Sequence, residues 1–71
     1  MKKYFVESWN REYLIRIEEK DKKIESIERY DFNKKQWLED YKAGKLFGKM
    51  CIGSIDVDVI SEEEAKKLTN E

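Results

Sequence analysis

The chain has 71 residues, with fifteen Lys and Arg against sixteen Asp and Glu and a formal net charge of −1. A chain of this length forms one domain at most and buries one thin core, which excludes a deep enzyme pocket built by this chain alone. Its nine aromatic residues exclude a disordered chain, because disordered segments are poor in aromatic side chains. We therefore expect residues 1–71 to form a single small domain.

The first strand is expected over residues 3–8, which are rich in β-forming side chains. Trp9, Asn10 and Arg11 follow and indicate a tight turn. Asn10 is the residue of the three that best tolerates a left-handed backbone. The spacing predicts that the next strand runs antiparallel to the first.

The second strand is expected over residues 13–18 and alternates between two faces. Leu14 lies on the face away from the core. The loop at residues 19–23 is wholly charged and contains no glycine, which predicts a turn longer than the two-residue kind. The core face carries Tyr13, Ile15 and Ile17.

The third strand is expected over residues 24–32, and its alternation is imperfect. Ile27 lies on one face, whereas Ile24, Tyr30 and Phe32 lie on the other. The pattern predicts either a β-bulge or a strand with apolar cover on both faces.

Residues 33–47 allow two interpretations. In the first, a polar turn at residues 33–35 leads into a short fourth strand over residues 36–39. In the second, one helix begins at Asn33 as its N-cap. The strand is the favoured interpretation.

A short helix is expected over residues 40–47, with Asp40 as its N-cap and Gly44 or Gly48 at its end. Three glycines make residues 44–53 the least regular part of the chain. The residues expected to plug the core from this segment are Met50, Cys51 and Ile52.

The last strand is expected over residues 54–60, with Asp56 and Asp58 on its solvent face. Its buried face is expected to carry Ile55, Val57 and Val59. A helix then begins after Ser61, because Ser61 and Glu64 have the spacing of a capping box. Its inward-facing residues are Ala65 and Leu68.

These elements predict an α+β fold, with an antiparallel meander of four to five strands. A short central helix and the capped C-terminal helix are expected on one face of this sheet. The other face would then expose apolar side chains, which predicts a protein partner or a homodimer. The apolar residues expected on that face are Phe5, Trp9, Leu14 and Ile27.

Catalytic and cofactor chemistry finds little support in the sequence. The chain has no histidine, so the usual nucleophilic triads and zinc sites are excluded. Cys51 is interpreted as a small buried residue. Asp56 and Asp58 could hold a divalent metal, but charges that protect an edge strand are the favoured interpretation. Residues 44–50 lack the spacing of a phosphate-binding loop. We expect no enzyme activity, cofactor, metal or small-molecule substrate.

Nucleic-acid binding is the alternative function. Five lysines accompany aromatic residues over residues 34–49, and single-strand binders combine positive grooves with stacking rings. The charge signal is weak, because residues 1–53 carry a net charge of only +3 and residues 54–71 carry −4.

The leading expectation is a non-enzymatic protein-interaction module. The Lys-, Glu- and Ile-rich composition resembles that of small proteins from AT-rich bacterial genomes and their phages, without naming a family. An inhibitor of a host protein, encoded by a phage or mobile element, or a self-associating domain would fit. The single cysteine and the absence of a long apolar run predict a cytoplasmic protein without membrane contact. The residues expected to contact the partner are Leu14, Ile27, Trp37, Tyr41, Lys45, Phe47 and Lys49.

Overall fold

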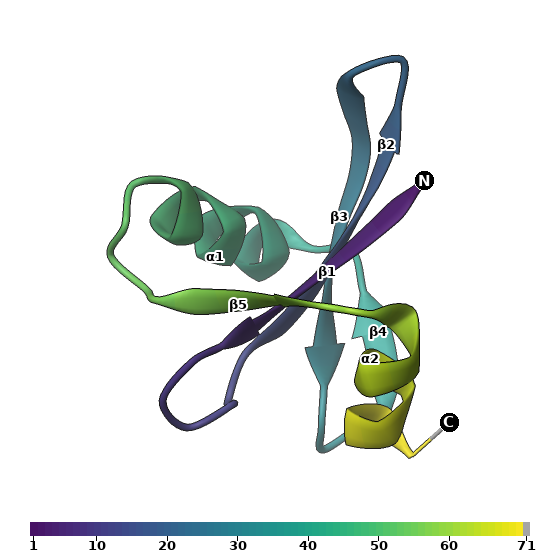
Figure 1. The fold of residues 1–71 in the computed structure, drawn as a ribbon, viewed down its shortest axis with the longest axis vertical. Coiled ribbons are helices and arrows are strands. Elements are labelled where there is room, and N and C mark those ends of the chain that lie inside the picture. The colour runs from purple at the N-terminus through teal and green to yellow at the C-terminus, as the bar shows by residue number, and fades with distance from the viewer. Residues whose placement is uncertain (71) are drawn as a thin grey trace.

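A computed structural model describes residues 1–70 and confirms the α+β class, with five strands and two helices (Figure 1). The elements in chain order are β1 (Lys2–Glu7), β2 (Leu14–Lys20), β3 (Lys23–Asp31), β4 (Gln36–Leu38), α1 (Tyr41–Cys51), β5 (Val57–Ile60) and α2 (Glu62–Thr69). The favoured interpretation of a strand at residues 36–39 is therefore confirmed.

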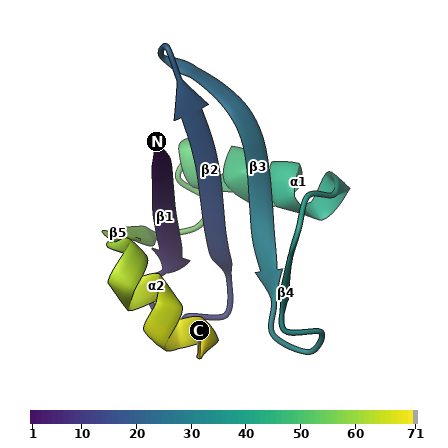
Figure 2. The same cartoon turned by 90° about the vertical axis from the view of Figure 1, so that its right-hand side faces the viewer.

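The sheet is antiparallel, with strand order β4-β3-β2-β1-β5. The first four strands form the expected meander. The chain then crosses over through α1, so that β5 pairs with β1 at the opposite edge from β4 (Figure 2). The β2–β3 hairpin projects beyond the rest of the sheet.

The hairpin turn differs from the expected long loop. Asp21 and Lys22 form a two-residue turn, and both have positive φ (52° and 65°). Such a turn matches the twist of the flanking strands, although it is usually made by Asn and Gly. The expected bulge is confirmed, because the pairing register between β2 and β3 shifts at Glu18 and Glu19.

The β1–β2 turn also differs in one residue. Arg11, with φ 54°, takes the left-handed position that we expected for Asn10. The nearly buried carboxylate of Glu7 organises this turn, since its Oε1 accepts the backbone N–H of Asn10 and of Glu12, each at 3.1 Å.

The two helices lie on opposite faces of the sheet, whereas we expected both on one face (Figures 1 and 2). Phe47 of α1 packs on Phe5, with 6.3 Å between ring centroids, and Phe5 pairs with Ile15. The side chains of neighbouring positions point to the other face, where α2 covers them. This arrangement explains why Leu14 and Ile15 are both buried, and why the strands carry apolar residues on both faces.

The main core lies beneath α2. It comprises Tyr4, Val6, Leu14, Tyr30, Ile60 and Ala65, with Trp37 and Leu68 packed against it. The Trp37 ring makes edge contacts with Tyr4 (6.1 Å) and Tyr30 (5.2 Å). Leu14 is only 1% exposed, so the expectation that it contacts a partner does not agree with its position.

Asp40 caps α1 as expected, but α1 continues past both glycines to Cys51. Gly44 and Gly48 face open space on the outer side of the helix, so they neither end it nor enter a crowded contact. The expected plug is also wrong, because Cys51 and Ile52 are exposed and Met50 is half-buried. The N-cap and the inward-facing side chains of α1 outweigh the unfavourable helix propensity of glycine.

The burial of β5 agrees with the expected alternation at Val57, which is half-buried, and at Asp58, which is exposed, but not at its last two residues. Val59 is 72% exposed, whereas Ile60 is buried in the core beneath α2. Because β5 is an edge strand, its valine face is only partly covered. The capping box of α2 is confirmed, since Ser61 Oγ accepts the Glu64 N–H at 3.1 Å. Neither α1 nor α2 has the length and apolar character needed to cross a membrane.

Candidate binding groove

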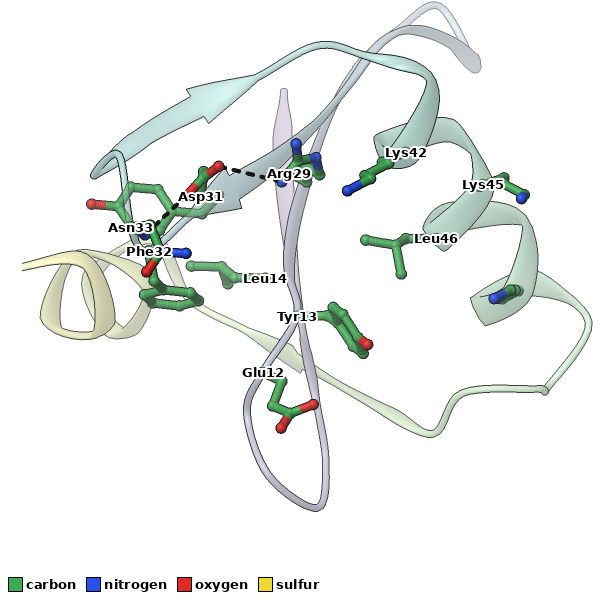
Figure 3. Close-up of a pocket in the computed structure, with 12 residues that line it drawn as sticks. Glu12, Tyr13, Leu14, Arg29, Asp31, Phe32, Asn33, Lys42, Lys45 and Leu46 are labelled. Carbon is green, nitrogen blue, oxygen red and sulfur yellow. Dashed lines mark hydrogen bonds and ion pairs between the residues drawn. The ribbon is translucent and has the colours of Figure 1, made fainter.

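An open groove runs between α1 and the neighbouring ends of β2 and β3 (Figure 3). Its volume is about 510 Å³. We call it the α1 groove. It is lined by Glu12, Tyr13, Leu14, Arg29, Tyr30, Asp31, Phe32, Asn33, Lys42, Lys45, Leu46 and Lys49.

The helical wall of the α1 groove is basic. Lys42, Lys45 and Lys49 are spaced by three and four residues, so they lie on one side of the helix. None of the three forms an ion pair within residues 1–70. Lys45 Nζ lies 5.5 Å from the centroid of the Tyr41 ring, and both side chains are exposed to solvent. The wall therefore presents three cations that an acidic ligand could neutralise.

The sheet side of the α1 groove is aromatic and apolar. Tyr13 and Phe32 are 40% and 41% exposed, and the Phe32 ring contacts Tyr30 edge-on at 4.9 Å. Leu46 extends from α1 toward the strand ends, whereas the Leu14 side chain points away from α1 into the core beneath α2 (Figure 3). The groove thus combines a row of cations with two accessible rings.

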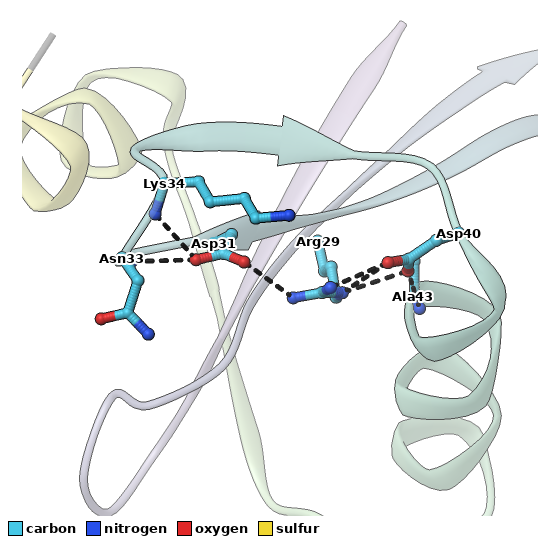
Figure 4. A network of polar contacts seen from close by, with 6 residues as sticks. All are labelled: Arg29, Asp31, Asn33, Lys34, Asp40 and Ala43. Carbon is cyan, nitrogen blue, oxygen red and sulfur yellow. Dashed lines mark hydrogen bonds and ion pairs between the residues drawn. The ribbon is translucent and has the colours of Figure 1, made fainter.

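An ion-pair network holds the groove's two walls together (Figure 4). Arg29 on β3 donates from Nη2 to Asp40 Oδ2 at 2.8 Å, and its Nη1 lies 3.8 Å from Asp31 Oδ2. Asp40 Oδ1 also accepts the Ala43 N–H at 3.0 Å as the N-cap of α1. Asp31 Oδ1 accepts the backbone N–H groups of Asn33 (2.9 Å) and Lys34 (3.0 Å).

These contacts keep both aspartates charged. The Arg29 guanidinium, followed by the Ala43 N–H, lowers the pKa of Asp40 below its ordinary value. The backbone N–H of Lys34, followed by that of Asn33, lowers the pKa of Asp31. The hydrogen bonds that Arg29 donates to Asp40 raise the pKa of Arg29. Arg29 offsets only one of the two carboxylates, so the network keeps a negative charge, and the positive charge of the groove comes from the three lysines.

The structure brings together only part of the expected partner-contacting set. Lys45 and Lys49 line the groove and are exposed, whereas Leu14, at the margin of the groove, is buried in the core beneath α2. Tyr41 is 80% exposed on the outer side of α1. The remaining three lie elsewhere and are half-buried: Phe47 against Phe5, Trp37 beneath the α2 side, and Ile27 paired with Ile17.

Several groove residues were missing from that set, among them Tyr13, Arg29, Phe32 and Lys42. Continuing the helix past Gly44 would have placed Lys42 beside Lys45 and Lys49. A two-residue hairpin turn, with its register, would have placed residues 12–14 beside residues 30–32. The sequence did not favour either inference. Gly44 and Gly48 favoured an earlier end of the helix, and the lack of glycine at residues 19–23 favoured a longer turn.

The chain matches no protein-family model and has no significant match to curated proteins or to solved structures.

Asp56 and Asp58 lie outside the α1 groove. Asp56 directly precedes β5, and Asp58 lies within it. Asp56 Oδ2 accepts the Trp9 Nε1–H at 3.3 Å. In the part of the chain that the structure describes, no three His, Cys, Asp or Glu side chains form a group that could hold a metal ion.

Proposed function

We propose that the protein is a non-enzymatic interaction module that binds an acidic segment of a partner protein in the α1 groove. The observation that carries this proposal is the row of Lys42, Lys45 and Lys49, which line the groove without ion-pair partners among residues 1–70. Carboxylates of the segment would lie along the lysines. Opposite charges across an interface steer association and fix the register of the ligand.

The aromatic side of the groove supplies the anchoring contacts. Tyr13 and Phe32 are accessible rings, and aromatic side chains in partly closed pockets commonly dominate interface energies. An apolar side chain of the segment would rest on these rings and on Leu46. The Arg29–Asp40 contact holds α1 against β3, so the two walls are positioned before binding.

The function fits a module that occupies another protein's surface, such as an inhibitor of a host protein encoded by a phage or mobile element. A self-associating domain is the other form of the same proposal. We place it in the cytoplasm, because Cys51 is an exposed free thiol and such thiols persist in reducing compartments.

Single-stranded nucleic acid is the second candidate ligand. The lysine row beside two exposed rings resembles the positive, ring-lined grooves of single-strand binders. Glu12 and Asp31 also line the groove, however, and a continuous phosphate backbone would have to pass both. A peptide needs carboxylates only opposite the lysines, so the protein partner is favoured.

Charge reversal tests the proposal. A short acidic peptide with a central phenylalanine should bind the native chain at low salt and bind Lys45→Glu/Lys49→Glu roughly tenfold or more weakly. The matched control, Lys20→Glu/Lys23→Glu on the hairpin tip, has the same change in charge and should bind like the native chain. Affinities can be measured by fluorescence anisotropy, with thermal unfolding to confirm that each variant folds.

Two results would contradict the proposal. One is equal weakening by the groove and hairpin-tip variants, which would show a general charge effect. The other is tighter binding of an oligothymidylate than of the peptide, lost with rising salt and abolished by Lys45→Glu/Lys49→Glu. That second outcome would assign the groove to nucleic acid.

A further inference from the structure

A second surface, separate from the α1 groove, lies along the outer edge of β5. The sheet ends at this strand, and within residues 1–70 its pairing partner is β1. Ser8 N–H donates to the Asp56 carbonyl oxygen at 2.9 Å, which sets the phase of the ladder. Along a strand of an antiparallel pair, every second residue directs its backbone N–H and C=O groups toward the paired strand. Asp58 therefore directs these groups toward β1, as Asp56 does. The backbone N–H and C=O groups of Val57 and Val59 therefore point away from the sheet.

The two faces of this edge differ in chemistry. Val59 is 72% exposed and pairs with Phe5, which is half-buried, so this face is apolar. Asp58 is exposed on the opposite face, and the acidic start of α2 follows within a few residues. A strand added to this edge would meet valine side chains on one face and carboxylates on the other.

We propose that the β5 edge is a docking site for an extended segment of a partner protein that carries basic side chains at alternate positions. Main-chain hydrogen bonds to Val57 and Val59 would supply affinity, as in other cases of strand addition. The basic side chains would lie beside Asp58 and the first glutamates of α2. The small or apolar side chains between them would pack on Val59.

The same carboxylates disfavour a second copy of the chain as the occupant. A symmetric antiparallel pair in which Val57 and Val59 exchange hydrogen bonds with a second β5 places Asp58 directly opposite its own copy. Like charges in directly opposed positions destabilise strand pairing. Charge on an edge strand is a common protection against self-association, and here it also selects a partner of opposite charge.

The test uses the full chain and three blocked peptides. One alternates lysine with threonine, one alternates glutamate with threonine, and one is the lysine peptide with N-methyl groups along the edge that would pair. In ¹H–¹⁵N spectra, the lysine peptide should shift the amides of Val57 and Val59 and slow their hydrogen exchange. The N-methylated and glutamate peptides should bind roughly tenfold or more weakly.

A charge swap gives the sharper readout. Asp58→Lys should prefer the glutamate peptide over the lysine peptide, whereas the matched control Glu25→Lys, on the projecting hairpin, should keep the native preference. The proposal is overturned if the lysine peptide produces no shifts at β5, if N-methylation has no effect, or if Glu25→Lys changes the preference as much as Asp58→Lys.

Discussion

The two faces of the sheet differ in how completely a helix covers them. Beneath α2, six side chains form a closed core, and Trp37 and Leu68 seal its margin. On the other face, α1 buries Ala43 fully but leaves Leu46, Phe47 and Met50 only half-buried. Ile15 and Ile17 are buried on the α1 side as well, but we expect the packing beneath α2 to contribute more to stability, because α1 leaves a lysine-lined groove open.

Truncating one apolar side chain on each face tests this difference with the largest expected effect. Leu14→Ala removes a fully buried side chain and is expected to lower the free energy of unfolding by about 2–5 kcal/mol. Leu46→Ala removes a half-buried side chain and should cost less than half as much. Urea unfolding followed by tryptophan fluorescence measures both, and equal costs would contradict the proposed division between the faces.

The Arg29–Asp40 contact gives the α1 side its own pH dependence. The pKa of Asp40 is lowered in the folded chain, whereas the pKa of an aspartate in the unfolded chain is about 3.9. Its stabilising effect is therefore complete above the unfolded pKa and disappears as pH falls through the folded pKa. Asp40→Asn should lower stability at neutral pH and flatten the loss of stability in acid.

Stability measured between neutral pH and the acid range checks this prediction. Glu39→Gln is the matched control, since it removes the same charge next to Asp40 without touching Arg29 or Ala43. An Asp40→Asn curve parallel to the native one would show that this contact does not hold α1 to the sheet. Asp31, whose pKa is also lowered, should leave part of the acid dependence in place.

The exposed glycines of α1 predict a smaller, stabilising effect. Gly44 and Gly48 have helical neighbours and open space where a Cβ would lie. Gly44→Ala and Gly48→Ala should each raise the free energy of unfolding by about 1 kcal/mol, because alanine has the higher helix propensity. Binding of the acidic peptide should not change, since both positions lie outside the groove. A loss of stability in either variant would contradict the described helix.

The hairpin turn predicts an effect of similar sign and slightly smaller size. Lys22 occupies a left-handed conformation that glycine adopts without steric cost. Lys22→Gly should therefore raise the free energy of unfolding by roughly 0.5–1 kcal/mol, without affecting either surface. Lys20→Gly, at a regular strand position, is the control and should destabilise the chain.

Local signals in the sequence predicted much of the fold. Asp40 and Ser61 were recognisable as N-caps because capping depends on a side chain and the next few N–H groups. The period-two pattern placed the strands. It did not reveal that α1 and α2 cover opposite faces, because that depends on the path of the chain between β4 and β5.

The groove was harder to predict than the strands. Tyr13 and Phe32 come from different strands, and Lys42 comes from a helix that continues through two glycines. Their proximity follows from the hairpin register and from the packing of α1 on β2 and β3. Pattern reasoning recognised Lys45 and Lys49 as candidates because they are basic and near aromatics, but it paired them with Trp37, which lies on the other face.

Mapping an acidic peptide onto the chain by ¹H–¹⁵N chemical-shift changes tests the central claim most directly. The peptide with a central phenylalanine should shift the amides of the α1 groove, above all those of Lys42, Lys45, Lys49, Tyr13 and Phe32. It should leave α2 unchanged. Shifts centred on α2, or no shifts even at low salt, would contradict the assignment of the α1 groove as the binding surface.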